Sequence, residues 1–299
     1  MSTALEEYDA AGDLLGRAIS AKVKAHAAPV EVAELQLSRG NVLSRIAGAG
    51  SEAAAELGRA ASTARVVGRT DLLVKARTTL ATLYGSREQI PKGAKVLDQL
   101  LDELGPNPSE HRLAAHRLKA KLWFGHTPGR AVDALDDAVR EATALGDARA
   151  ELESRMERHT LQLGFGRAPT DSFALLGALA EQVGDAALTN ELRIKEAAAL
   201  VATGEPVLAE TTAQQVRQSA LEQRDPLAYF QACALIAEAR HLADDRIGVL
   251  SILLTCRATL REDISEEAAQ PAEQLLASLE TRWGPEGLKK ALEDYQAEG

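Results

Sequence analysis

A short motif returns along the chain at nearly constant spacing, as Leu-Gly-Pro at Leu104–Pro106, Leu-Gly-Asp at Leu145–Asp147, Val-Gly-Asp at Val183–Asp185 and Gln-Arg-Asp at Gln223–Asp225. The interval is 41 residues from Gly105 to Gly146, 38 from Gly146 to Gly184, and 40 from Gly184 to Arg224. Each copy ends one Ala- and Leu-rich run and begins another. Repeats of this length, with a helix on either side of the break, are typical of a solenoid of stacked helix hairpins. The motif therefore predicts an all-α fold.

The composition agrees with closely packed helices. Hydrophobic residues make up 45% of the 299 residues, but aromatic residues only 3%. A core built mainly from Ala and Leu suits helix–helix contacts and is poor material for a β-sandwich. The length is enough for two ordinary globular domains or for one longer solenoid.

The charge excludes several classes of partner. The formal net charge is −10, whereas a protein that binds duplex nucleic acid needs a basic surface to displace counterions. The same charge disfavours an anionic membrane surface. The sequence has no run of about 18 apolar residues that would span a bilayer. The first residues are acidic where a secretion signal is basic and then apolar. We therefore expect a cytoplasmic protein with neither nucleic acid nor membrane as its partner.

The helical periodicity predicts an N-terminal extra helix within residues 1–28, packed on a single continuous repeat domain at 29–299 with about seven antiparallel hairpins. In the first hairpin we expect Ser51 to be the N-cap of the second helix. The predicted helices lie at 4–27, 30–47, 52–67, 71–84, 89–104, 109–124, 130–145, 147–163, 171–183, 185–202, 207–223, 226–242, 246–260, 265–283 and 286–296.

A second regularity lies within the hairpins. The second helix reads Ala-x-x-x-Leu-x-x-Ala twice, as Ala53, Leu57 and Ala60 and again as Ala131, Leu135 and Ala138. Spacings of four and three place these residues on one helix face, where small side chains let the partner helix approach closely.

Together these residues resemble the tetratricopeptide (TPR) repeat family. The resemblance is carried by the second-helix stripe, by the first-helix stripe Leu80-Ala-x-Leu-Tyr84 and by the Gly-Asp or Gly-Pro turn. The period exceeds the family's length of about 34 residues. It is closer to the long repeats in sensor regions of large bacterial transcription activators, where Ala142-Thr-Ala-Leu-Gly-Asp147 has its counterpart. The family's usual Trp and Phe are absent. The resemblance implies a right-handed superhelix, a groove lined by first helices, and no catalysis.

The helix predicted at 109–124 is unusually basic for an acidic chain. Arg112, His116, Lys119 and Trp123 follow at spacings of four, three and four, and in the repeat family this face tends to line the groove. Cations beside a Trp suit an acidic peptide or a free C-terminal carboxylate. The neighbouring helices offer Arg77 (or Lys75) and Arg155 (or Arg158). An ordinary solvated helix face is the alternative interpretation.

Other candidate sites are weaker. His111 and His116 are five residues apart and so diverge on a helix, whereas a helical zinc pair needs a spacing of three or four. We therefore expect no metal and no cofactor. The sequence has no phosphate-binding loop and no nucleophile elbow, and we nominate no catalytic residue. The only cysteines, Cys233 and Cys256, are interpreted as small core residues.

Two features near the C-terminus each have two interpretations. Trp283 either seals the core of the last hairpin or is an exposed anchor for a partner. The run Ile247–Leu254 is apolar around most of the helix, so it is either buried by both neighbouring helices or a surface for self-association. We favour burial for both.

The sequence thus predicts a non-catalytic scaffold or adaptor that binds a peptide or partner protein in the groove. The alternative is a regulatory sensor that responds to a small ligand or a signalling peptide. Fold alone does not decide between them, because function lies in the side chains that line the site.

Overall fold

The computed structural model describes residues 2–166, 169 and 171–298, and in this part of the chain all regular structure is α-helical. The predicted all-α fold of consecutive helices is confirmed, and most helix ends lie within a few residues of the predicted ones. The helices are α1 (Ser2–Lys24), α2 (Pro29–Ser44), α3 (Gly50–Val66), α4 (Thr70–Gly85), α5 (Ile90–Leu104), α6 (Glu110–Trp123), α7 (Pro128–Leu145), α8 (Ala148–Gly164), α9 (Phe173–Val183), α10 (Ala186–Thr203), α11 (Pro206–Gln223), α12 (Pro226–Leu242), α13 (Arg246–Asp263), α14 (Glu266–Trp283) and α15 (Pro285–Glu298).

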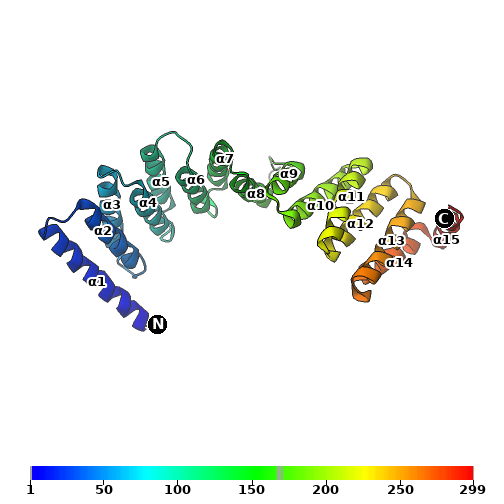
Figure 1. Ribbon diagram of the computed structural model, residues 1–299, viewed down its shortest axis with the longest axis horizontal. Helices are drawn as coiled ribbons and strands as arrows, with labels where there is room; N and C mark the ends of the chain where they lie inside the picture. The colour runs from blue at the N-terminus through cyan, green and yellow to red at the C-terminus, as the bar shows by residue number, and fades with distance from the viewer. Residues whose placement is uncertain (1, 167–168, 170, 299) are drawn as a thin grey trace. The chain divides into compact units, whose positions relative to one another are not determined.

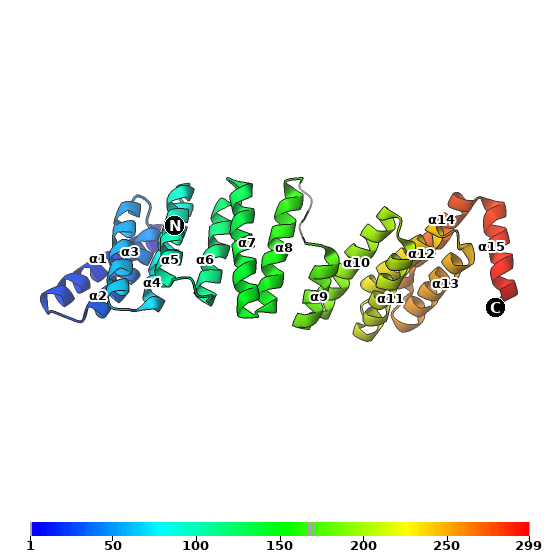
Figure 2. The same cartoon turned by 90° about the horizontal axis from the view of Figure 1, so that it is seen from above.

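Contacts between Cα atoms divide the chain into two compact units, Met1–Pro169 and Thr170–Gly299. The first unit contains α1–α8 and the second α9–α15. Within each unit, successive helices lie side by side in chain order (Figures 1 and 2). The division separates α8 from α9, the two helices of the fourth predicted hairpin. A single repeat domain at 29–299 and the right-handed turn of its superhelix therefore stay predictions.

The recurring Gly-Asp motif ends one helix and caps the next. Gly146 follows α7 with φ +68°, a left-handed conformation that glycine adopts at little cost. The next residue, Asp147, accepts a hydrogen bond from the backbone N–H of Ala150 at 3.0 Å and so caps α8. Gly184 and Asp185 repeat this arrangement between α9 and α10. One dipeptide thus both stops a helix and starts its successor.

The motif's first and last copies depart from this pattern. After Gly105 the chain runs on to Ser109, whose hydroxyl caps α6. At the last copy Arg224 takes the left-handed position with φ +56°, and Asp225 caps α12.

The prediction of Ser51 as an N-cap was wrong. The helix α3 begins at Gly50, two residues before the predicted start, so Ser51 lies inside the helix and Ala49 precedes it without a side-chain cap.

The core of each hairpin is made of the small and large residues that the stripe predicts. Ala53, Leu57, Ala131 and Ala138 are fully buried. A methyl group added at Gly40 on α2 would lie 2.6 Å from the Leu57 side chain, so the two helices of this hairpin pack as closely as a glycine allows. Small residues rather than aromatic ones therefore set the spacing of the helices.

The second unit has one continuous core. The apolar run Ile247–Leu254 lies on α13, where Val249, Leu250, Ile252 and Leu253 are buried, and α13 packs against both α12 and α14. Burial of this run is confirmed. Trp283 is partly buried and packs against the same core. Cys233 and Cys256 are fully buried free thiols in that core, as the sequence predicts.

Candidate functional site

The two sides of the α6–α7 hairpin in the first unit differ in how neighbouring helices are spaced. The helices α2, α4 and α6 are the first helices of successive hairpins. They approach closely, α2 to α4 and α4 to α6, with Cα atoms within 8 Å. The second helices α3, α5 and α7 approach one another less closely. The side of the first helices thus corresponds to the face that was expected to form the groove. Between α6 and α8, however, the first helices are also less closely spaced than α4 and α6.

Arg112 lies inside the hairpin stack and not on an open face. Its side chain is only 17% exposed, and Nε donates to Oε1 of Glu141 on α7 at 2.5 Å. Its Nη1 donates to the carbonyl oxygens of Leu101 and Gly105, at 3.1 and 2.5 Å. Arg112 therefore ties the end of α5 and the following loop to α7, which is a structural task.

His116 is buried one helical turn further along α6. Its Nδ1 is 3.6 Å from Oδ2 of Asp137 and has no hydrogen-bond partner among the described residues. Burial lowers the pKa of His116 below its ordinary value of 6.5, against the opposing attraction of Asp137 and Glu141. The imidazole is therefore neutral at pH 7.

Lys119 and Trp123 lie on the side of the second helices. They line a pocket of about 310 Å³ between α5 and α7, called here the charged pocket. Lys119 donates to Oδ1 of Asp98 at 2.6 Å. Trp123 is 5% exposed, with the Arg130 guanidinium 4.6 Å above its ring. The lining residues of the charged pocket are Pro91, Ala94, Lys95, Asp98, Lys119, Trp123, Arg130, Asp133, Ala134 and Asp137.

The two flanking arginines are also paired within the chain. Arg77 on α4 makes two hydrogen bonds to the carboxylate of Glu103, at 2.7 and 3.1 Å. Arg155 on α8 bonds Glu151 one turn earlier, with the closest nitrogen–oxygen distance at 2.7 Å. Arg77, Arg112, Lys119 and Arg155 therefore each face a carboxylate already, whereas Lys75 has no ion pair among the described residues. Binding of a partner through these residues stays a prediction.

A second pocket lies on the side of the first helices, where α6 and α8 are spread. It has a volume of about 390 Å³, its floor is α7, and we call it the apolar pocket. Phe124, the C-cap of α6, is 58% exposed at this pocket, although most Phe side chains are largely buried. Its lining residues are Ala120, Lys121, Phe124, Ala131, Leu135, Met156, Glu157, Thr160 and Leu161.

Charges mark the edge of the apolar pocket. Arg117 on α6 reaches across to α8, where it bonds Glu153 and Glu157, each at 2.8 Å. This bridge holds α6 and α8 at their present separation. Lys121 is exposed and has no ion pair among the described residues, so one cation at the pocket edge is available to a partner.

Sequence reasoning did not find the apolar pocket. The signal available was Phe124, one of only four Phe in the chain, placed directly after a helix and next to glycine. The pocket depends on the separation of α6 from α8, which no local pattern of residues encodes. The basic residues of α6 drew attention to the opposite side of the hairpin.

No group of three or more His, Cys, Asp or Glu suited to a metal ion occurs in the part of the chain that the structure describes. Within the same residues, no helix combines the length and the apolar character needed to cross a lipid bilayer.

Comparison with models of protein families gave no match, and none of the curated proteins searched matches the sequence either. Among solved structures, the chain is similar to a kinesin light chain-like protein from Podosopora anserina with nearly identical TPR-like repeats. Their identity is 18% and the TM-score is 0.38, over 64% of this chain and 96% of that one. A second similar structure is BtubC (BKLC) from P. vanneervenii, with 15% identity and a TM-score of 0.42 over 86% and 91% of the two chains. The TPR-like repeats are those of the first protein, and both TM-scores lie below 0.5.

Proposed function

We propose that the chain is a non-catalytic, cytoplasmic interaction scaffold that binds a peptide or partner protein on the side of its first helices. The observation that carries this proposal is the apolar pocket between α6 and α8, with Phe124 exposed at its edge. Exposed aromatic side chains beside an apolar pocket are typical of protein-binding sites, because burying them against a partner is favourable.

The lining of the pocket selects the chemistry of the partner. Ala120, Leu135, Met156 and Leu161 form walls that accept a bulky aliphatic or aromatic side chain, and a volume of about 390 Å³ is enough for one such anchor and its neighbours. Lys121 at the edge favours an acidic residue close to that anchor. The proposed partner is therefore a segment with a large apolar side chain next to an Asp or Glu, which keeps the expectation of an acidic partner.

The alternative binding site is the set of residues predicted from the sequence, namely Arg112, His116, Lys119, Trp123, Arg77 and Arg155. An acidic peptide at these residues would have to replace Glu141, Asp98, Glu103 or Glu151 as the partner of each cation. Such an exchange gives little net free energy, since one carboxylate substitutes for another. We therefore place the partner at the apolar pocket.

The test uses a display library of short peptides selected on the full chain. Selected peptides are then measured by fluorescence anisotropy against the wild type, Phe124→Asp and Lys119→Glu. We expect Phe124→Asp to weaken binding at least about tenfold, because a carboxylate takes the place of the apolar contact. Lys119→Glu is the matched control on the other side of the hairpin and should bind as the wild type does.

Equal binding by Phe124→Asp and the wild type would contradict binding at the apolar pocket, and loss of binding in Lys119→Glu alone would indicate the charged pocket. Phe124 is largely exposed, so its replacement leaves the melting temperature nearly unchanged and loss of binding is not loss of fold.

A second candidate function is a regulatory sensor that responds to a small ligand. It is favoured by a separate open pocket in the second unit, beside Arg224.

A further inference from the structure

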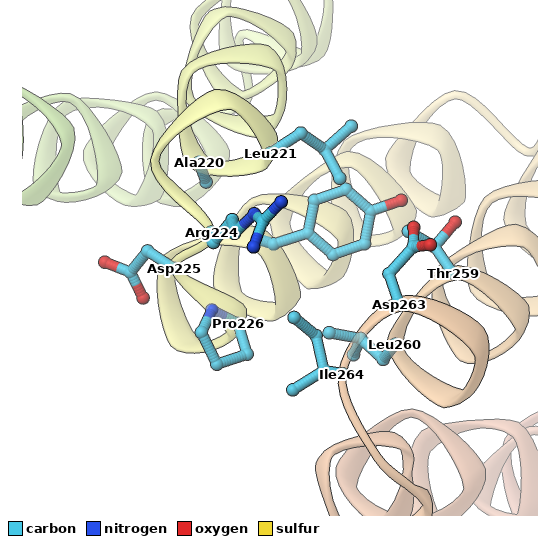
Figure 3. A pocket seen from close by; sticks show the side chains of 10 residues that line it. Ala220, Leu221, Arg224, Asp225, Pro226, Thr259, Leu260, Asp263 and Ile264 are labelled. Atoms are coloured by element: carbon cyan, nitrogen blue, oxygen red, sulfur yellow. The ribbon is translucent and has the colours of Figure 1, made fainter.

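A pocket of about 330 Å³ opens in the second unit where α11 ends, α12 begins and α13 ends (Figure 3). We call it the Arg224 pocket. It lies wholly within α11–α13 and is independent of the apolar pocket in the first unit. Its size is in the range of sites for small molecules.

The backbone at Arg224 is unusual for the residue that occupies it. Arg224 has φ +56°, whereas Gly146, Gly184 and Gly204 occupy the corresponding left-handed position after α7, α9 and α10. A side chain in this conformation is strained, and glycine closes the same turn without strain. The turn alone therefore gives no reason for an arginine, and strain of this kind is often retained where the side chain serves a site.

The charges of the pocket stand on opposite elements. Arg224 follows α11, and Asp263 is the last residue of α13 (Figure 3). Neither side chain has an ion pair or a side-chain hydrogen bond among the described residues. The carboxylate of Asp225 is already used, since it accepts from the backbone N–H groups of Leu227 and Ala228. One cation and one anion are thus left to a ligand.

Apart from the hydroxyl groups of Tyr229 and Thr259, the remaining walls are apolar and partly uncovered. Leu221 and Ile264 line the pocket and are 40% and 43% exposed, while Leu260 is buried beneath them. Covering Leu221 and Ile264 with an apolar group is favourable, because it removes apolar surface from water. A ligand that fits carries two opposite charges close together and an aliphatic part beside them.

We propose that the Arg224 pocket binds a free α-amino acid with a large aliphatic side chain. Arg224 takes the carboxylate, Asp263 takes the ammonium group, and Leu221, Leu260 and Ile264 cover the side chain. A simple anion such as phosphate fits less well, since Asp263 would repel it and the chain carries a net charge of −10. A metal ion is disfavoured by Arg224 in the same pocket.

The test is isothermal titration calorimetry of the full chain with L-leucine, N-acetyl-L-leucine and L-leucinamide. The second compound lacks the ammonium group and the third lacks the carboxylate. We expect L-leucine to bind and each analogue to bind at least about tenfold more weakly, because each loses one charge-assisted hydrogen bond. Absence of L-leucine binding, or equal binding of all three compounds, would overturn the proposal.

Variants assign the two charges. Arg224→Gly should lose binding of L-leucine without a lower melting temperature, since glycine relieves the strained turn. Glu88→Gly makes the same relief at another left-handed position, φ +59°, outside the pocket, and should bind as the wild type does. Asp263→Asn should remove the preference for L-leucine over its N-acetyl form. Full binding by Arg224→Gly would contradict the proposal, and these results are independent of peptide binding in the first unit.

Discussion

The charged pocket and the apolar pocket lie on opposite sides of the same α6–α7 hairpin, and they differ in the kind of side chain that lines them. In the charged pocket Lys119 already pairs with Asp98, and nearby Arg112 pairs with Glu141. At the apolar pocket Phe124 is exposed and Lys121 has no ion pair among the described residues. The exposed Phe124 side chain therefore distinguishes the apolar pocket, since Lys95, Arg130 and Asp133 of the charged pocket, like Lys121, have no ion pair among the described residues.

The largest effect is expected on the charged side, from Arg112→Glu. The change removes the bond to Glu141, places two carboxylates together, and leaves two carbonyl groups without their donor. We expect a loss of about 3 kcal/mol in the free energy of unfolding of the first unit, the cost of breaking a mostly buried ion pair. Urea unfolding followed by fluorescence of Trp123 in a Trp283→Phe background measures it. A loss of only about 0.5 kcal/mol, as expected for a surface ion pair, would show that Arg112 is not structural.

This expectation corrects one based on the sequence alone. If Arg112 and Lys119 lined an open groove, as the sequence predicts, reversing both charges would abolish binding with little change in melting temperature. Because Arg112 holds α5, the following loop and α7 together, that double variant would now be expected to lose stability as well.

The second-largest effect is expected at the apolar pocket, where a substitution of Lys121 changes the affinity for the selected peptides. Lys121→Glu should weaken the selected acidic peptides about tenfold, since it replaces attraction by repulsion at the pocket edge. The free energy of unfolding should change little, because Lys121 has no partner to lose. Anisotropy at two salt concentrations checks the cause, since the difference between Lys121→Glu and the wild type should shrink as salt screens the charges. A difference that salt does not change would place Lys121 outside the contact.

The third prediction is that the stability of the folded chain depends on pH through His116, which lies near the charged pocket. The pKa of His116 is lowered by burial, so the unfolded chain takes up a proton at its ordinary pKa near 6.5 while the folded chain does not. The contribution of His116 to stability is therefore present above about pH 6.5 and is lost as the pH falls below it. Melting curves of the wild type and His116→Gln over this range should converge as the pH falls. Parallel curves would show that His116 does not titrate in this way.

The smallest effect is expected from Lys119→Ala. The pair with Asp98 is partly exposed, with side chains 23% and 52% accessible, so its loss should cost about 0.5 kcal/mol. Urea unfolding of the same kind detects it. A cost as large as that of Arg112→Glu would remove the distinction between the structural ion pair and the surface one.

The helices could be predicted from the sequence because their signals are local. The Gly-Asp motif specifies a left-handed stop and an N-cap within two residues, and the stripe of Ala53, Leu57 and Ala60 specifies the buried face. The division into two units near residue 169 has no such signal, and neither does the spreading of α6 from α8. Both depend on the sum of contacts between helices.

The candidate site was harder to predict for a related physical reason. The sequence shows that Arg112 and Lys119 are cations, but it does not show that Glu141 and Asp98 meet them from other helices. Conversely, Phe124 is one apolar residue among many until its exposure is known. The sequence thus identifies the type of each side chain, but the partners that decide its role become known only from the structure.

The most direct test of the proposed binding site uses the methionines. The chain has two, Met1 and Met156, and Met156 lines the apolar pocket. Methyl-labelled methionine therefore gives one NMR signal from inside the pocket and at most one reference signal from the N-terminus. A selected peptide should shift the Met156 signal in the wild type and in Lys119→Glu, but not in Phe124→Asp at the same concentration. Binding that leaves the Met156 signal unchanged would contradict the account.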